Sequence, residues 1–263
     1  MNKTLRQLGY PEKLYIYVVL FVGTLIGMLY VTETRLPQGG RPPYLFLVWN
    51  TFLAWIPAGL ALAMDGVSLL HAKGLKWLLY CITGGLWLFF YPNAAYLITD
   101  LLHPFARLDI EGTSLFWQDI LFWDHLFTVL FTAILGLMLG TISLASVHRL
   151  VEKSYGRIAG ICFAVAVLAL GSFGVYLGRF FRFNSWDVLH HPLRMVREIL
   201  SYFTDMEHIA HAYSYCMWIF LITSFWYLVF CLFGAMNRRM TRGGDQTFES
   251  QREASGTISY PRK

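Results

Sequence analysis

Apolar residues dominate six long stretches of the chain, and short polar segments separate them. These stretches cover residues 14–32, 44–64, 76–99, 121–147, 157–181 and 213–236. Each is close to or above the roughly 20 residues that a helix needs to cross a bilayer, and strand-like alternation is absent. The pattern predicts an all-α polytopic membrane bundle of about six transmembrane helices.

The remaining segments predict one membrane domain with short ends. Residues 1–13 form an N-terminal segment, residues 14–236 form the six-helix transmembrane domain, and residues 237–263 form a polar tail with the composition of disorder. The first apolar stretch follows three basic residues, as in a signal peptide, but it ends without a small-residue cleavage site. We therefore interpret it as an uncleaved span.

The connection at residues 188–212 has a helical periodicity of its own. After Pro192, apolar residues recur at helical spacing, with charged residues on the other side. This predicts an amphipathic helix at the outer membrane surface, which either connects two spans or roofs a site. The apolar positions are Leu193, Val196, Ile199, Leu200, Phe203 and Met206.

Composition and charge set the class of protein and its orientation. The chain is 56% hydrophobic and 14% charged, which is typical of a membrane protein. Its net charge of +5 does not indicate nucleic-acid binding, because the basic residues are scattered at helix ends. Fourteen of the 21 Lys and Arg residues lie on the side of the two termini, which predicts a multi-pass cell-membrane protein with both termini in the cytoplasm. Ten of the sixteen acids and six of the eight histidines lie on the outer side, so we expect the chemistry there.

Two residue types in the spans predict packing rather than chemistry. The four cysteines form no C-x-x-C pair, and we expect them to be buried packing residues. Glycines recur at four-residue spacing, which allows helix backbones to approach closely in lipid. They are Gly136, Gly140, Gly156, Gly160, Gly174 and Gly178.

The outer end of the third stretch carries the first candidate site residues. Pro92 should kink this helix and free a carbonyl for neighbouring side chains. At helical spacing, Asn93, Tyr96, Asp100 and His103 then occupy one stripe. Polar groups at this depth should face the bundle interior or a water-filled cavity.

The fourth and fifth stretches offer partners at the same depth. Tyr176, Arg179 and Arg182 follow one another at three-residue spacing, and we expect at least one arginine to pair with Asp100 or to hold an anionic ligand beside it. Asp124 is the deeper of two acids that open the fourth stretch, so we assign it to the same cavity. Trp117 and Trp123 fit an interfacial aromatic belt.

The residues after Arg182 have two interpretations. Asn184 is a good helix N-cap with Asp187 at the third helical position, so the segment can serve as a chain reversal. Alternatively, Asp187 completes a divalent-metal site with Asp100, His103 and Asp124. His208 and His211 have a spacing that can chelate zinc, but the pair lacks the motif of a zinc protease.

Three motifs resemble a known family. The stretches "PNAAYLITDLLH", "FWDH" and "GVYLGRFFRFNSWD" are similar to those of bacterial membrane proteins grouped as domain-of-unknown-function family 1361, over roughly residues 45 to 235. The resemblance implies a bacterial multi-span membrane protein, without implying an activity. It supports treating as one set the residues Asn93, Tyr96, Asp100, His103, Asp124, Arg179, Arg182, Asn184 and Asp187.

Three functions remain open on the sequence. The favoured one is a membrane enzyme whose site opens at the outer leaflet, with Asp100, His103 and Asp124 as catalytic or metal-binding groups. Its substrate would be a membrane lipid or envelope intermediate with an anionic group, held by Asn93, Tyr96, Tyr176, Arg179, Arg182 and Asn184. The second is a transporter or ion-binding protein that uses the same site, although the inner halves of the spans show few polar residues. The third is an accessory subunit in which these groups only lock helices together.

Overall fold

The computed structural model describes residues 9–108, 116–181 and 192–256, with the side chains of the last helix described as far as Met236. Within these residues every regular element is helical. Six helices are long and apolar enough to cross a membrane: Glu12–Glu33, Phe46–Ser68, Lys73–Arg107, Ile120–Tyr155, Arg157–Phe181 and Met206–Met236. The prediction of an all-α polytopic bundle is confirmed, and the protein is a multi-pass membrane protein.

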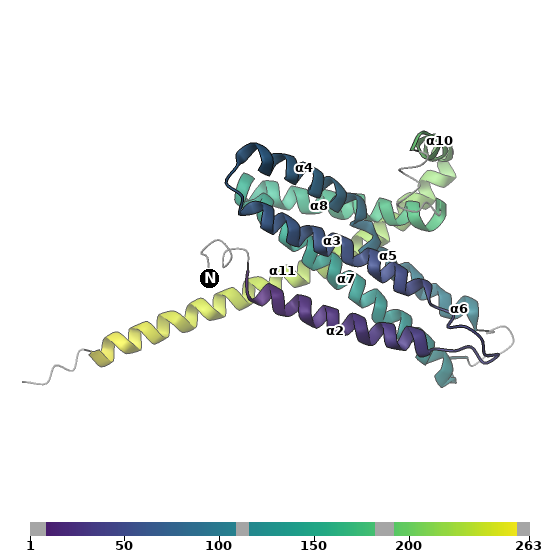
Figure 1. Cartoon of the computed structure of the whole chain (residues 1–263), viewed down its shortest axis with the longest axis horizontal. Helices are drawn as coiled ribbons and strands as arrows, with labels where there is room; N and C mark the ends of the chain where they lie inside the picture. Colours follow the sequence, from purple (N-terminus) through teal and green to yellow (C-terminus); the bar gives the residue numbers. More distant parts are fainter. Residues whose placement is uncertain (1–8, 109–115, 182–191, 257–263) are drawn as a thin grey trace, which may run out of the picture. The chain divides into compact units, whose positions relative to one another are not determined.

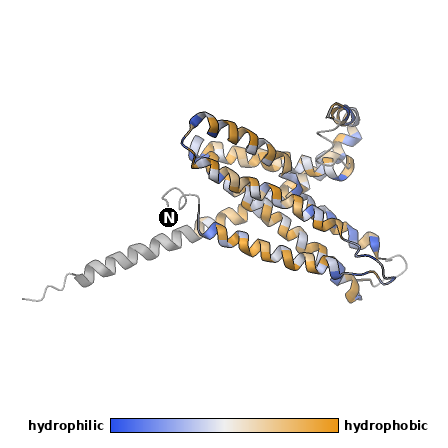
Figure 2. Ribbon diagram, viewed as in Figure 1, coloured by the Kyte–Doolittle hydropathy of each residue, from blue (hydrophilic) through white to orange (hydrophobic). Residues whose placement is uncertain are grey.

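Helix α7 (Ile120–Tyr155) is the most buried of these helices. It packs against α2 (Glu12–Glu33), α3 (Phe46–Ser68) and α8 (Arg157–Tyr176), while α4 (Lys73–Phe90) packs against α3 (Figure 1). In the most apolar window of α7, 67% of the residues are buried, against 11% in the last span. The helices are hydrophobic along most of their length and hydrophilic mainly near their ends, as expected for helices in a bilayer (Figure 2).

The third span is broken into four consecutive pieces. Helix α4 ends at Phe90, and it is followed by α5 (Pro92–Tyr96), the 3-10 helix η1 (Leu97–Leu102) and α6 (His103–Arg107). Pro92 has no N–H to donate, and the Ala94 N–H bonds to the Tyr91 carbonyl in a tighter turn. The Asn93 side chain donates to the Phe90 carbonyl at 3.0 Å. The predicted kink is confirmed, and a neighbouring side chain satisfies a carbonyl at the break.

The kinked segment packs against glycines of α7 and α8. A Cβ atom on Gly136 would lie 2.4 Å from the Ala94 carbonyl oxygen, and one on Gly174 would lie 2.4 Å from Pro92 Cγ. Both glycines therefore act as predicted, by allowing close approach. Gly156 differs from the prediction, because it has a φ of +89° and forms the turn between α7 and α8. Its role is conformational, since other residues rarely adopt that backbone.

The described C-terminal part of the chain consists of two helices. The amphipathic helix α10 (Pro192–Tyr202) ends before Phe203, so Met206 and His208 belong to the next helix, α11 (Met206–Gly256). Helix α11 continues through most of the segment predicted as a disordered tail, where no proline interrupts it. The chain divides within α11 into two compact units, Met1–Ser224 and Phe225–Lys263.

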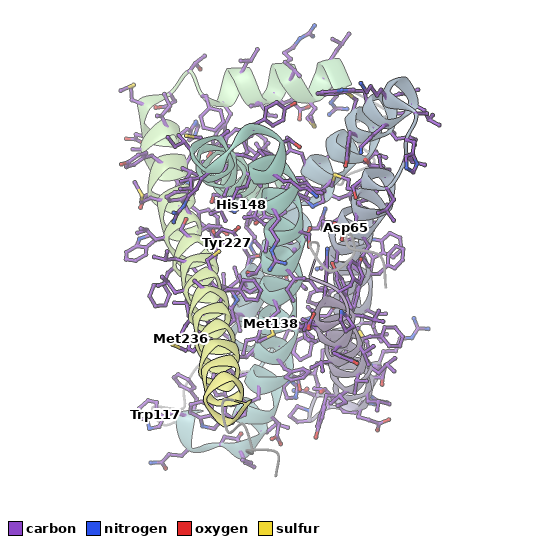
Figure 3. All side chains as sticks on the ribbon, turned by 90° about the vertical axis from the view of Figure 1, so that its left-hand side faces the viewer. Asp65, Trp117, Met138, His148, Tyr227 and Met236 are labelled. Atoms are coloured by element: carbon purple, nitrogen blue, oxygen red, sulfur yellow. The ribbon has the colours of Figure 1, made fainter. Side chains whose placement is uncertain are left out.

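Many apolar side chains of the spans are exposed, Met138 of α7 among them, and Trp117, just before α7, projects outward in Figure 3. These surfaces are apolar, as expected where lipid covers a helix. Cys81 and Cys162 lie on them and are exposed, so the prediction that all four cysteines are buried is wrong. Sequence composition does not separate a lipid-facing position from a core position, because both are apolar.

The close contact at Gly136 yields a stability prediction. Gly136→Ala should lower the free energy of unfolding by about 1–3 kcal/mol, because the new methyl group overlaps a backbone oxygen. Gly85→Ala is the matched control, since a Cβ there meets nothing within 4 Å. Thermal unfolding of both variants in detergent checks this. Equal stability of the two variants would contradict the close packing of α5 on α7.

Candidate functional site

Asp100 is the buried centre of the candidate site at the end of the third span, named the outer site after its predicted side of the membrane. It lies in η1 with 1% of its surface exposed. Asn50 of α3 donates an amide N–H to Asp100 Oδ2 at 3.0 Å. Asn50 was not among the predicted site residues, because a lone asparagine in an apolar stretch gives no motif. A buried carboxylate needs such a donor, and this one comes from a different span.

His103 is the partner of Asp100 on the same segment. Its Nδ1 lies 3.0 Å from the Asp100 carbonyl oxygen and 3.6 Å from Oδ1, so Nδ1 carries the proton and donates. The two residues are neighbours because η1 has about three residues per turn, which places positions i and i+3 in line. The imidazole also packs on the Phe46 ring with centroids 4.5 Å apart. Among the described residues, Nε2 has no hydrogen-bond partner, and the side chain is 26% exposed.

Asn93 and Tyr96 lie on the same kinked span, but their contacts differ from those of Asp100. Asn93 uses its amide on the Phe90 carbonyl, as described above. Tyr96 packs against the backbone of Gly178, where a Cβ would lie 3.2 Å from the ring. The predicted stripe is therefore divided, because the change from α-helix to 3-10 helix alters the angle between successive residues.

Arg179 approaches the outer site from the fifth span. It belongs to η3 (Leu177–Phe181), a π-helical turn. Its positive charge acts on both Asp100 and Tyr215, although the described residues contain no Arg179–Asp100 ion pair within 4.0 Å. The direct pairing predicted for Asp100 is thus not formed by Arg179. Arg182, Asn184 and Asp187 lie outside the described residues.

Tyr176 faces a second cluster instead of Asp100. Its hydroxyl lies 3.1 Å from the Tyr202 hydroxyl and 3.2 Å from His211 Nδ1. His208 stacks on the Tyr202 ring at 3.9 Å and donates from Nδ1 to the Tyr202 carbonyl. The π-helical turn after Tyr176 explains why Arg179 does not follow it at the regular helical angle. His208 and His211 thus contact aromatic residues that link α8, α10 and α11.

The sequence predicts that Asp124 faces the bundle interior, but His125 faces it instead. Asp124 is exposed, whereas His125, one position later on α7, is buried. The His125 Nε2–H donates to the Arg35 carbonyl at 3.1 Å, and its Nδ1 accepts from the Tyr44 hydroxyl at 2.8 Å. Successive helix positions differ by about 100°, so only one of the two can face the bundle.

The predicted metal set is therefore not assembled by the residues that the structure describes. Asp124 faces away from the bundle, and no three His, Cys, Asp or Glu side chains converge in the described part of the chain. Asp100 and His103 alone remain together, and a role for Asp187 stays a prediction. Two such ligands are fewer than the three that catalytic zinc sites usually have.

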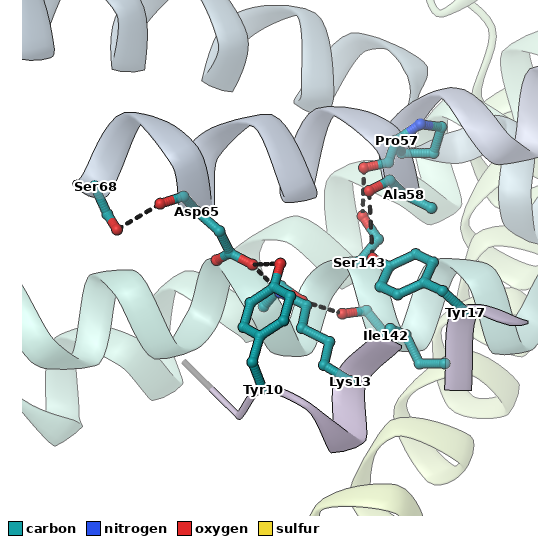
Figure 4. A network of polar contacts seen from close by, with 10 residues as sticks. Tyr10, Lys13, Tyr17, Pro57, Ala58, Asp65, Ser68, Ile142 and Ser143 are labelled. Atoms are coloured by element: carbon teal, nitrogen blue, oxygen red, sulfur yellow. Dashed lines mark hydrogen bonds and ion pairs between the residues drawn. The ribbon is translucent and has the colours of Figure 1, made fainter. Parts of the chain in front are cut away.

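A second charged centre lies at the opposite end of α3. Lys13 of α2 forms a buried ion pair with Asp65, and the Tyr10 hydroxyl donates to the same oxygen, Oδ2, at 3.2 Å (Figure 4). Burial and the charge of Asp65 raise the pKa of Tyr10 to about 12. Asp65 was missed because it stands alone at the end of an apolar stretch. The expectation that the halves of the spans on the predicted inner side hold few polar groups is corrected by this pair, because both residues lie within α2 and α3.

Neutral hydrogen bonds tie α2, α3, α4 and α7 together. Trp87 Nε1 donates to the Ser143 hydroxyl at 2.6 Å, and that hydroxyl donates to the Pro57 carbonyl at 3.0 Å. The Tyr17 hydroxyl donates to the Ala58 carbonyl at 3.3 Å (Figure 4). Hydrogen bonds between helices stabilise a bundle where lipid offers no alternative partner.

The sequence matches one family, described as "Protein of unknown function (DUF1361)", over residues 49–231. The chain belongs to the DUF1361 family. This span of the family includes α3 through most of the last membrane helix, and thus Asn50, Asp100, His103 and Arg179. Lys13 lies before the matched region, so half of the inner ion pair is outside it. No curated protein and no solved structure matches the chain.

The Asn50–Asp100 contact can be tested through stability. Asn50→Leu should lower the free energy of unfolding by about 1–3 kcal/mol, because a buried carboxylate oxygen loses its donor. Adding Asp100→Leu should recover a large part of this loss, since the orphaned charge is removed as well. Thermal unfolding in detergent measures both effects, with the exposed Gln118→Leu as control. A single variant as stable as wild type would exclude Asn50 as the support of Asp100.

Proposed function

We propose that the protein is an integral membrane enzyme in which Asp100 and His103 carry out acid–base chemistry at the outer leaflet. Its substrate is a lipid or envelope intermediate with an anionic group. One observation supports this most: His103 donates Nδ1–H to the Asp100 backbone carbonyl, with the Asp100 carboxylate 3.6 Å from the same nitrogen, while its Nε2 is left without a partner among the described residues. An imidazole fixed in this way presents one nitrogen that can accept a proton.

Each residue of the proposed site has a distinct task. Asp100 holds the His103 ring in the Nδ1–H form and would stabilise the imidazolium that forms when Nε2 takes a proton. Asn50 keeps Asp100 in place. Arg179 supplies positive charge close to the dyad, where it would stabilise negative charge that develops on the substrate.

A divalent metal is a variant of the same proposal. Metal-binding histidines commonly donate their second ring N–H to a carbonyl or carboxylate, which is what His103 does with Nδ1. His103 Nε2 would then be a ligand, and the remaining ligands would come from substrate, water or Asp187. Metal analysis of purified wild type, Asp100→Ala and His103→Ala separates the two forms of the proposal.

The enzyme proposal predicts a loss of turnover without a loss of folding. Purified wild type incubated with an envelope lipid extract should consume or form a lipid species detectable by mass spectrometry. His103→Ala should reduce this rate at least about 100-fold, the usual contribution of a general acid or base. His71→Gln is the control, because His71 is exposed and lies outside the proposed site. If folded His103→Ala keeps the wild-type rate, Asp100 and His103 are not catalytic. If the wild type changes no lipid, the interpretation as an accessory subunit is favoured.

The buried Lys13–Asp65 pair supports transport as a second candidate function. A transporter that moves a proton or cation needs ionisable groups within the membrane, and these helices carry one centre at each end of α3. In that case Asp100 would be one binding position and Asp65 another. An enzyme, by contrast, needs access to Asp100 from only one side of the membrane.

Accessibility of introduced cysteines distinguishes these functions and tests the proposed orientation in the cell membrane, with both termini cytoplasmic. In a cysteine-free background, Leu102→Cys should react with a membrane-impermeant maleimide from outside, and Tyr10→Cys only after permeabilisation. Asn50→Cys should react from outside alone if the protein is an enzyme. Labelling of Asn50→Cys from both sides would favour a transporter, and labelling of Tyr10→Cys from outside would reverse the orientation.

A further inference from the structure

Three side chains of α3 at the outer site differ in how deeply they are buried. Asn50 contacts Asp100 in the interior, Phe46 packs on His103 at half depth, and Trp49 is exposed. These three positions follow one another around the helix, in the order Asn50, Phe46, Trp49, within about 100°. The His103 ring packs on Phe46 and therefore lies beside the exposed face of α3 that carries Trp49.

That surface is apolar and aromatic. Trp49 packs on Phe52 with ring centroids 5.3 Å apart, and both rings are exposed. Leu102, the residue before His103, is also exposed. A hydrocarbon chain lying on Trp49 and Phe52 would stay in the membrane while its polar end reached His103.

A positive charge stands at the polar end of this surface. Arg107 lies four residues after His103 on α6, so the two side chains are neighbours on one helix face. Burial raises the pKa of Tyr44 to about 12, and the charge of Arg107 acts on Tyr44 in the opposite direction. Tyr44 contacts Phe46, which in turn contacts His103. His103 thus contacts the beginning of α3, and the charge of Arg107 acts on Tyr44, which lies just before this helix.

Arg107 is not engaged elsewhere in the described part of the chain. It is exposed, and none of the described carboxylates lies within 4.0 Å of it. The nearby Arg35 differs, because its guanidinium donates to the carbonyls of Thr32 and Thr34. A guanidinium with unused donors at a membrane boundary is suited to a phosphate group.

We infer that Arg107 binds the phosphate of a membrane lipid whose hydrocarbon chain lies on Trp49 and Phe52, so that the headgroup is presented to His103. This inference rests on the proposed function and makes it specific. The substrate is a lipid whose phosphate gives it a net negative charge and which enters sideways from the bilayer, and Arg107 is its anion-binding residue. Arg179 stays on the interior side, near Asp100 and Tyr215.

Lipid binding without turnover tests this inference. Detergent-purified protein is titrated with phosphatidic acid or with phosphatidylcholine of the same acyl chains, and bound lipid is measured by native mass spectrometry. Wild type should bind phosphatidic acid more tightly than phosphatidylcholine. Arg107→Gln should weaken phosphatidic acid binding about tenfold, the effect of losing one charge-assisted contact. Arg197→Gln, at an exposed outer arginine of α10, should change it little.

Three results would overturn the inference. Arg107→Gln could bind phosphatidic acid as wild type does, or Arg197→Gln could weaken binding as much as Arg107→Gln. Inorganic phosphate could compete as effectively as the lipid, which would make the ligand a soluble anion. Because these titrations measure binding only, they are independent of the turnover assay. Loss of binding in Arg179→Gln alone would reject the role of Arg107 and leave the enzyme proposal standing.

Discussion

The outer site depends on the close contact between the segment Pro92–Tyr96 and the glycine faces of α7 and α8. Without side chains at Gly136 and Gly174, the kinked backbone can lie directly on its neighbours. The 3-10 turn η1 begins directly after this contact and aligns Asp100 with His103. Close packing between helices thus positions the segment that carries the buried Asp100 and its partner.

Charged groups in this bundle are stabilised by partners from distant parts of the chain. Asp100 depends on Asn50, which precedes it by 50 residues, and Asp65 depends on Lys13, which precedes it by 52. Both contacts involve α3, so this helix carries one polar centre near each of its ends. Helix α3 therefore supports both polar centres, although its composition is mainly apolar.

The sequence predicts the spans well, because their length and hydrophobicity follow directly from the thickness of a bilayer. It also identifies the Asp100–His103 segment, since a proline followed by polar residues is conspicuous in an apolar stretch. It misplaces Asp124 and Tyr176, because a small change in helix phase decides which neighbour faces inward. His125, the neighbour of Asp124 in sequence, is the residue that faces the bundle, and the Tyr176 hydroxyl contacts His211 instead of the Asp100 site.

The partners that the sequence misses have a common physical cause. Asn50, Asp65 and Tyr44 are single polar residues in or beside apolar stretches, and their importance arises only when another helix is packed against them. Similarly, the 3-10 and π-helical turns shift side chains by amounts that a regular helical period does not anticipate.

The turn at Gly156 makes the glycine faces local in sequence. A single residue separates α7 from α8, and its positive φ reverses the chain directly. Helices α7 and α8 therefore form one helical hairpin. The two glycines that contact the kinked segment, Gly136 and Gly174, lie on the two arms of this hairpin, so a single turn sets their relative position.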